Sequence, residues 1–383
     1  MFHKLLFTAC LIMTAAFGVR PVSAQMDFWG QIDLAAVRGY EAPYWNRQIR
    51  GDDTFNDVRL RLFAQHWMTD RIGVFAELLF DLKAAARVNG AYVVVNELLG
   101  EEWLGARVGL APTSIGTYGM RSSYFNQSGL VAIPMQRGWR TTMDNGGRAT
   151  PEDFMRRKAD NVRKMPVLYD ACWNIMWELL GTVGKLSYAI GATSGSLSNP
   201  MGPLSEPGLQ WIGRLGYTPA LGVTVGVSGA QGPYIGDYKG PAADILGPAI
   251  ENPDEYDQRY LGVDLELSRD RYELFGEAYT NSYELENVQE RVAVRGAYLE
   301  GRRWISPSVF LAARGEVMDF GGITVPGTSG LQDWDDDVRR VEAAVGYRLT
   351  RESILRLGWQ HTAFVQGNDE TQNVLIAHIS AVF

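Results

Sequence analysis

Apolar and polar side chains alternate, residue by residue, over many short stretches of this chain. In the stretch 58–67, Val58 and Leu60 share one face and Arg59 lies on the other, because side chains along a strand point alternately to opposite sides. A short polar segment, 68–71, separates it from a second alternating stretch at 72–84. The pattern predicts two antiparallel strands joined by a tight turn.

The same pairing recurs along the chain, with longer and less regular connections between the pairs. This order is typical of an all-β fold, a transmembrane antiparallel up-and-down β-barrel with tight turns at one end and long loops at the other. We predict about 16 strands, an even number that returns both ends of the chain to the same side. Their expected ranges are 26–37, 55–67, 72–84, 91–98, 102–110, 166–180, 184–194, 208–218, 221–231, 258–268, 271–281, 288–299, 304–318, 338–349, 353–365 and 373–383.

The chain ends on an alternating stretch, "LIAHISAVF", whose Leu375, Ile379 and Phe383 share one face. In a bilayer the backbone polar groups must find partners within the protein, so a spanning sheet has to close on itself. The last strand is therefore predicted to pair with the first, near 26–37.

The first 24 residues have the pattern of a secretory signal peptide. Lys4 precedes an apolar run at 5–19, and the small residues of Val22-Ser23-Ala24 suit a cleavage site before Gln25. The run is shorter than the roughly 20 residues of a membrane-spanning helix. We predict a signal peptide at 1–24 and one domain, an outer-membrane β-barrel, at 25–383.

Cleavage removes Lys4 and Arg20 but no acid, so the net charge changes from −8 to −10. Cys172 is then the only cysteine, which excludes a small scaffold held by disulfides.

With its signal-like start, its predicted strands and its terminal Phe383, the chain resembles a Gram-negative outer-membrane porin. The segment 103–116, "WLGARVGLAPTSIG", also resembles phosphate-selective-type porins, in which an Arg-Val-Gly strand enters a proline-containing loop. Leu110 and Ala111 stand where that family usually has an aromatic residue and a lysine. The resemblance implies an integral multi-pass barrel of the cell outer membrane that forms a water-filled channel for passive diffusion of small hydrophilic solutes.

The resemblance also implies the partners. They are outer-membrane lipid and lipopolysaccharide, the barrel-assembly machinery through Phe383, small hydrophilic solutes and a possible homotrimer. No nucleic acid, metal or cofactor is expected.

The longest connection, 112–165, is expected by resemblance to fold into the lumen and form the constriction. It holds nine basic residues against four acids, which leaves about +5 in an acidic chain. Thr150 and Pro151 suit the start of a short helix that carries Arg156, Arg157 and Lys158. A solvated surface helix is the alternative interpretation.

Strand alternation places further charges in the lumen, if the apolar faces meet lipid. The candidate pore-lining and constriction residues are Arg59, Arg61, Arg107, Arg140, Arg156, Arg157, Lys158, Arg291, Arg295, Arg314, Arg340, Arg348, Arg356, Asp264 and Glu277. Six of the arginines fall on strands twelve to fifteen and predict a basic wall. Asp264 and Glu277 belong to an acidic wall on the two preceding strands. The pore is therefore predicted to prefer anions, the alternative being that the charges only pair with each other.

Other classes of function have weaker support. The chain has only four histidines, and no Ser-His-Asp or histidine metal site can be assembled from the pattern. We expect the protein not to be an enzyme. The alternatives are a barrel enzyme of the phospholipase or protease type and a structural or adhesion barrel without a channel. The acidic runs "ENPDEYDQ" and "DWDDD" are candidate sites for a divalent cation or, more simply, solvated loops.

Overall fold

The computed structural model describes residues 26–39, 58–81, 86–118, 129–169, 173–199, 208–235, 252–365 and 371–383. The predicted signal peptide, 1–24, and Cys172 lie outside these ranges.

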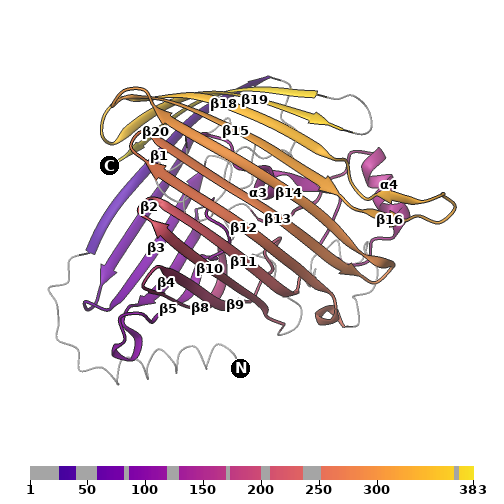
Figure 1. The fold of residues 1–383 in the computed structure, drawn as a ribbon, viewed down its shortest axis with the longest axis horizontal. Helices are drawn as coiled ribbons and strands as arrows, with labels where there is room; N and C mark the ends of the chain where they lie inside the picture. The colour runs from indigo at the N-terminus through magenta and orange to yellow at the C-terminus, as the bar shows by residue number, and fades with distance from the viewer. Residues whose placement is uncertain are drawn as a thin grey trace.

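Sixteen antiparallel strands form one closed barrel (Figure 1). In order around the barrel they are β1 (Met26–Gly39), β2 (Val58–Trp67), β3 (Ile72–Asp81), β4 (Arg87–Val95), β5 (Gly105–Pro112), β8 (Trp173–Val183), β9 (Leu186–Thr193), β10 (Gln210–Ala220), β11 (Val223–Pro233), β12 (Asp257–Arg269), β13 (Tyr272–Leu285), β14 (Val288–Trp304), β15 (Val309–Phe320), β18 (Val338–Arg348), β19 (Ser353–Phe364) and β20 (Thr371–Val382). The predicted fold class is confirmed.

The barrel closes between its first and last strands. β1 pairs with β20 in an antiparallel register that sets Leu34 opposite Ile379 and Gln31 opposite Val382. Every strand of the barrel therefore has a neighbour on both sides, and the sheet has no free edge to satisfy. The predicted pairing of the chain's last strand with its first is confirmed.

The strands are polar inside and apolar outside. On β15, Arg314 and Glu316 are only 2% and 5% exposed, whereas Leu311 and Val317 are 51% and 39% exposed. A soluble protein buries the opposite set of residues. A charged side chain that faces lipid near the bilayer midplane costs about 2–4 kcal/mol, so this distribution suits a barrel surrounded by hydrocarbon.

One predicted turn was wrong. The segment 300–303, "EGRR", was expected to connect two strands, but β14 continues to Trp304 and the chain turns at 305–308. Glu300 and Arg302 point inward and form ion pairs with the inward side chains of Arg314 and Glu273. Charged residues that line a polar lumen look like turn residues in a sequence, and this similarity displaced the predicted boundary.

The remaining elements belong to the connections. Inside the long connection between β5 and β8 lie α3 (Met135–Gly138), β6 (Arg140–Thr141), α4 (Pro151–Ala159) and β7 (Met165–Pro166). β16 (Gly322–Thr324) pairs with β17 (Leu331–Asp333), and two short 3-10 helices are η1 (Leu98–Gly100) and η2 (Pro253–Glu255). Figure 1 shows α4 and β16 near each other at one end of the barrel and the C-terminus at the other. Within the ranges given above, no helix has the length and apolar character needed to cross a membrane.

Candidate pore constriction

The connection between β5 and β8 binds the inner surface of the barrel. Its course changes at Gly116, whose φ of +61° is a backbone conformation that glycine adopts readily. The Gly116 N–H donates to Ser228 Oγ on β11 at 3.0 Å. A Cβ at this position would lie 2.6 Å from Glu277 Oε2, so only glycine lets the chain come this close to the wall.

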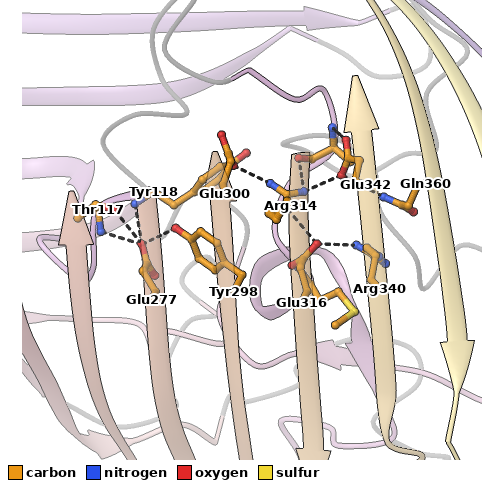
Figure 2. Close-up of polar contacts among 12 residues, drawn as sticks. Thr117, Tyr118, Glu277, Tyr298, Glu300, Arg314, Glu316, Arg340, Glu342 and Gln360 are labelled. Atoms are coloured by element: carbon orange, nitrogen blue, oxygen red, sulfur yellow. Dashed lines mark hydrogen bonds and ion pairs between the residues drawn. The ribbon is translucent and has the colours of Figure 1, made fainter. Parts of the chain in front are cut away.

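Glu277, on β13, is the first anchor of this connection. Its Oε1 accepts hydrogen bonds from the backbone N–H groups of Thr117 and Tyr118, both at 2.8 Å, and from the Tyr298 hydroxyl at 3.0 Å. Its Oε2 accepts from Gln136 Nε2 at 2.6 Å. Figure 2 shows the carboxylate between the connection and the barrel wall. A buried carboxylate needs such a set of donors to offset the loss of its hydration.

Arg314, on β15, is the second anchor. Its guanidinium lies 3.1 Å from Glu300, 3.0 Å from Glu316 and 2.9 Å from Glu342, and it donates to the Ala132 carbonyl at 2.7 Å. These side chains come from neighbouring strands at the same height (Figure 2). Arg314 therefore joins three wall carboxylates to the backbone of the connection.

The carboxylates around Arg314 also bind the connection directly. Glu316 accepts from the Met135 N–H at 2.5 Å, and Glu342 accepts from the Ala132 N–H at 3.4 Å. Arg340 lies 3.8 Å from Glu316 and its guanidinium carbon is 5.6 Å from the ring centre of Trp139. Residues 113–118 and 129–142 thus make a line of contacts along β11, β13, β15 and β18, and we call this line the anchor row.

A second polar cluster lies where the barrel closes. His378 Nε2 is 3.2 Å from Asp33 Oδ1, and its Nδ1 is 3.3 Å from Arg356 Nη1. A guanidinium nitrogen can only donate, so Nδ1 accepts and the ring proton on Nε2 points to Asp33. Asp33 also lies 3.6 Å from Arg61 and accepts from Gln31. We call these five residues the seam cluster.

An ion pair between Arg107 and Glu178 lies where the long connection leaves β5, a place that we call the root of the connection. Arg107 Nη2 on β5 lies 2.5 Å from Glu178 Oε2 on β8, and it also donates to Ser114 Oγ at 3.2 Å. Both side chains face the interior, and Arg107 is 7% exposed. This ion pair fixes the point at which the chain leaves β5.

The helix predicted to carry the filter lies elsewhere. α4 is capped by Thr150, whose hydroxyl accepts from the Asp153 N–H at 3.2 Å while the Asp153 carboxylate accepts from the Thr150 N–H at 3.1 Å. Burial alone would raise the pKa of Asp153, but its hydrogen bonds to Thr150 and the nearby Arg157 guanidinium together lower it. The predicted cap and the proline at the first helical position are confirmed.

The basic residues of α4 pair with acids outside the anchor row. Arg156 lies 2.6 Å from Asp153 with its side chain 69% exposed, and Arg157 lies 2.7 Å from Asp144. Lys158 lies 3.6 Å from Asp336. Their assignment to the constriction is therefore not supported by the structure, and the alternative of a surface helix fits better.

The acidic run "DWDDD" (333–337) is the partner of this helix region. Arg163 pairs with Asp335 and, at 2.8 Å, with Asp336, while the Trp334 ring lies 5.7 Å from that of Phe154. Basic side chains thus occupy the carboxylates of Asp335 and Asp336, and the Asp337 carboxylate accepts from the Phe320 N–H at 2.7 Å. Across the ranges that the structure describes, no group of three or more His, Cys, Asp or Glu side chains is arranged for a metal ion.

No family model matches the chain, and no curated protein matches its sequence. Solved structures do match. OmpT, an outer membrane protein of Vibrio cholerae, is 12% identical with a TM-score of 0.59, and the match covers 95% of this chain and 99% of that one. An anion-selective porin from Comamonas acidovorans is 11% identical with a TM-score of 0.59 and a coverage of 94% and 100%. The outer membrane channel DcaP of Acinetobacter baumannii is 10% identical with a TM-score of 0.53, and the match covers 96% of this chain and 100% of that one. The chain has the fold of outer-membrane porins.

Most of the other wall residues predicted for the porin lumen do point inward. Arg59, Arg340 and Arg356 are 7%, 2% and 5% exposed on inward positions. Asp264 pairs with Arg214 at 2.5 Å, and the Arg348 guanidinium lies 4.5 Å from the Trp304 ring. The anchor row, the seam cluster and the ion pair at the root of the connection contain the others, which are Glu277, Arg314, Arg61 and Arg107.

Three candidates lie away from the lumen or the constriction. Arg295 is an exposed residue between the buried Val294 and Gly296, so it shares the outward face of β14. Arg291 also lies on that face and pairs with Glu284. Arg140 donates to the Lys164 carbonyl at 2.6 Å, within the connection itself. The predicted inward face was therefore correct for β15 but wrong for β14, where the even-numbered residues face the interior.

The sequence interpretation missed the acids that accompany the arginines. Glu300, Glu316 and Glu342 are at most 5% exposed and surround Arg314, so the predicted basic wall carries both signs of charge. Glu316 stands two residues after Arg314 and therefore on the same strand face, a signal that the sequence did contain. The contact of Asp33 with His378 joins the two ends of the chain, and no local pattern reveals it.

Proposed function

We propose that this protein is an integral porin of the Gram-negative outer membrane, a passive channel for small hydrophilic solutes. The observation that carries the proposal is the inverted surface of a closed barrel, in which Arg314 and Glu316 are buried while Leu311 is exposed. An apolar exterior suits lipid, and a charged interior suits water and polar solutes. The fold shared with outer-membrane porins supports the same proposal.

The test is reconstitution of the refolded protein in planar lipid bilayers. Stepwise increases of current in potassium chloride, absent with heat-denatured protein, are expected for a channel. A folded barrel that inserts into liposomes but conducts no ions would overturn the proposal and favour the adhesion or structural alternative.

We propose transport without catalysis. The seam cluster contains an Asp-His contact, and both ring nitrogens of His378 are already bound, one to Asp33 and one to Arg356. In a Ser-His-Asp triad the unprotonated ring nitrogen accepts the proton of the serine hydroxyl, and here that nitrogen, Nδ1, already accepts from Arg356. Hydrolysis of phospholipid or peptide by the refolded protein, abolished in His378→Asn, would contradict this proposal.

We propose that the channel prefers anions, and that the seam carries the preference. Beside His378, the guanidinium groups of Arg61 and Arg356 face the interior, and each lies near the carboxylate or the imidazole of the seam cluster. Both guanidinium groups are positive charges held in fixed positions on this part of the wall. Fixed charge near low-dielectric walls is poorly screened, so these local charges can outweigh the acidic net charge of the chain.

The preference is tested by reversal potentials under a salt gradient. Arg61→Gln and Arg356→Gln are expected to shift the reversal potential toward cation preference. Arg295→Gln is the matched control, because it removes the same charge from the outward face. Equal shifts in all three variants would overturn the assignment to the seam.

We propose a homotrimer in which β1 to β5 face the neighbouring subunits. Among the described residues, the outward positions of these strands carry no tryptophan or tyrosine, whereas Trp177, Trp211, Tyr217 and Tyr347 are exposed on later strands. Tryptophan and tyrosine are typical of positions at the membrane interface, so their absence from this sector suits a surface covered by protein. One solved structure with this fold is described as a trimer form of OmpT of Vibrio cholerae. Ala76→Arg, on β3, is expected to yield monomers in native mass spectrometry, and an unchanged trimer would contradict the choice of face.

We propose that the remaining outward surface contacts lipid and lipopolysaccharide, and that the barrel-assembly machinery recognises the strand ending at Phe383. Phe383 is 69% exposed and lies on the outward face. Replacement of Phe383 with leucine tests the recognition role.

A further inference from the structure

Four aromatic side chains form a continuous row on the inner wall of β1 to β4. The ring centres are 5.2 Å apart for Trp29 and Phe63, 6.2 Å for Phe63 and Phe75, and 4.9 Å for Phe75 and Tyr92. These residues take inward positions, because Trp29 lies opposite Phe63 and Phe63 lies opposite the fully buried Glu77. We call these four side chains the aromatic row.

The aromatic row differs from other inward rings in its exposure. Tyr279 and Phe310 also lie on inward positions, but they are only 7% and 0% exposed. Phe63 is 3% exposed, but Trp29, Phe75 and Tyr92 keep part of their surface accessible. Apolar surface inside a water-filled lumen is unfavourable unless something apolar covers it, so an accessible aromatic strip points to a solute that carries a ring.

Two guanidinium groups accompany the row. The guanidinium carbon of Arg61 lies 5.8 Å from the Phe63 ring centre, and that of Arg107 lies 5.9 Å from the Tyr92 ring centre. Arg107 is 7% exposed, and its Nε has no hydrogen-bond partner in the portion of the chain that the structure describes. A buried donor without a partner costs about 1–3 kcal/mol, and an oxygen acceptor brought by a solute would satisfy it.

We propose that the aromatic row and Arg107 form a binding site for aromatic carboxylates, small anions in which one ring carries one carboxylate. The ring of the solute packs against Phe75 and Tyr92, in the tilted or edge-to-face arrangements that aromatic pairs prefer. Its carboxylate accepts from Arg107 Nε. The proposal rests on the proposed channel function, because the solute reaches the site through the lumen.

The site lies close to the constriction along the chain. Arg107 also contacts Ser114 at the start of the inward connection, and Tyr92 lies opposite Gly109 on the same strand as Arg107. A solute held at Arg107 therefore occupies the lumen beside the root of that connection. Its residence should interrupt the flow of small ions.

The experiment compares benzoate with acetate in planar bilayers that contain the refolded protein. Both anions carry one carboxylate, but only benzoate carries a ring. Benzoate is expected to reduce the chloride current at concentrations where acetate has no effect. If the protein conducts chloride and benzoate behaves like acetate, this inference fails while the proposed channel stands. If no chloride current appears at all, the proposed channel has failed first.

Variants assign the effect to the row. Phe75→Leu and Tyr92→Leu are each expected to raise the half-blocking concentration of benzoate by about three- to tenfold, the range expected for loss of one aromatic contact. Trp359→Leu is the matched control, because Trp359 is an exposed ring on the outward face. Arg107→Lys keeps the charge but removes Nε, and it should weaken the block without moving the reversal potential. Equal block in the row variants and in Trp359→Leu would overturn the assignment.

Discussion

The ring of Phe383, the last residue, lies directly over the backbone of Gly30 on the outside of the barrel. The two residues exchange backbone hydrogen bonds, at 2.8 Å from the Gly30 N–H and 2.9 Å from the Phe383 N–H. A Cβ at Gly30 would lie 2.3 Å from Phe383 Cζ, so the glycine makes room for the ring. The terminal aromatic residue therefore extends the β20 ladder by one pair and covers the first strand.

This contact separates two roles of Phe383. If the ring serves recognition by the assembly machinery, Phe383→Leu should lower the amount of protein in the outer membrane while export across the inner membrane continues. Gly30→Val keeps the aromatic end but displaces the ring, and it should destabilise the closed barrel, measured as a lower temperature of unfolding in detergent. Wild-type surface levels for Phe383→Leu would show that only strand pairing matters.

Arg314 should be the most costly single charge to remove from the wall. Arg314→Met leaves Glu300, Glu316 and Glu342 together without their shared cation, and loss of one partner from a buried ion pair costs about 3–5 kcal/mol. The free energy of unfolding from denaturant titrations in detergent provides the measurement. Arg295→Met, on the outward face, is the control and should change it little. A loss below about 1 kcal/mol for Arg314→Met would contradict the anchor role.

Glu277→Gln should loosen the inward connection. The new side chain has one oxygen and one NH₂ group, so it cannot accept both from the Thr117 and Tyr118 N–H groups and from Gln136 Nε2. Hydrogen bonds to a charged acceptor are worth about 1.5–3 kcal/mol each. Single-channel recordings are expected to show larger current fluctuations than in wild type. Glu266→Gln, a less buried acid on neighbouring β12, serves as control. Identical recordings for wild type and Glu277→Gln would mean that Glu277 does not hold the connection in place.

Simultaneous replacement of Arg156, Arg157 and Lys158 with glutamine should leave ion selectivity nearly unchanged. These side chains pair with nearby acids beyond the anchor row, and such partly exposed ion pairs contribute little to a distant filter. Proteolysis should instead become faster around α4, because Lys158 no longer binds Asp336. A shift of the reversal potential as large as that of Arg356→Gln would return the triplet to the constriction.

The sequence by itself determined the barrel. Alternation in 58–67 and 72–84 assigns lipid and lumen faces whatever the partners are, because the period of a strand is two residues. Closure follows from the need to satisfy every backbone group in lipid, and the pairing of Leu34 with Ile379 is its result.

The tertiary structure alone decided which charges act together. Arg314 was visible as an inward arginine, but its three glutamates come from three strands, and the Ala132 carbonyl comes from a connection far away along the chain. The sign of the local charge depends on such distances, since electrostatic energy falls with separation and with screening. For the same reason α4 looked like a filter in sequence, whereas Asp336, which pairs with its Lys158, lies far away along the chain and becomes a neighbour only in the folded protein.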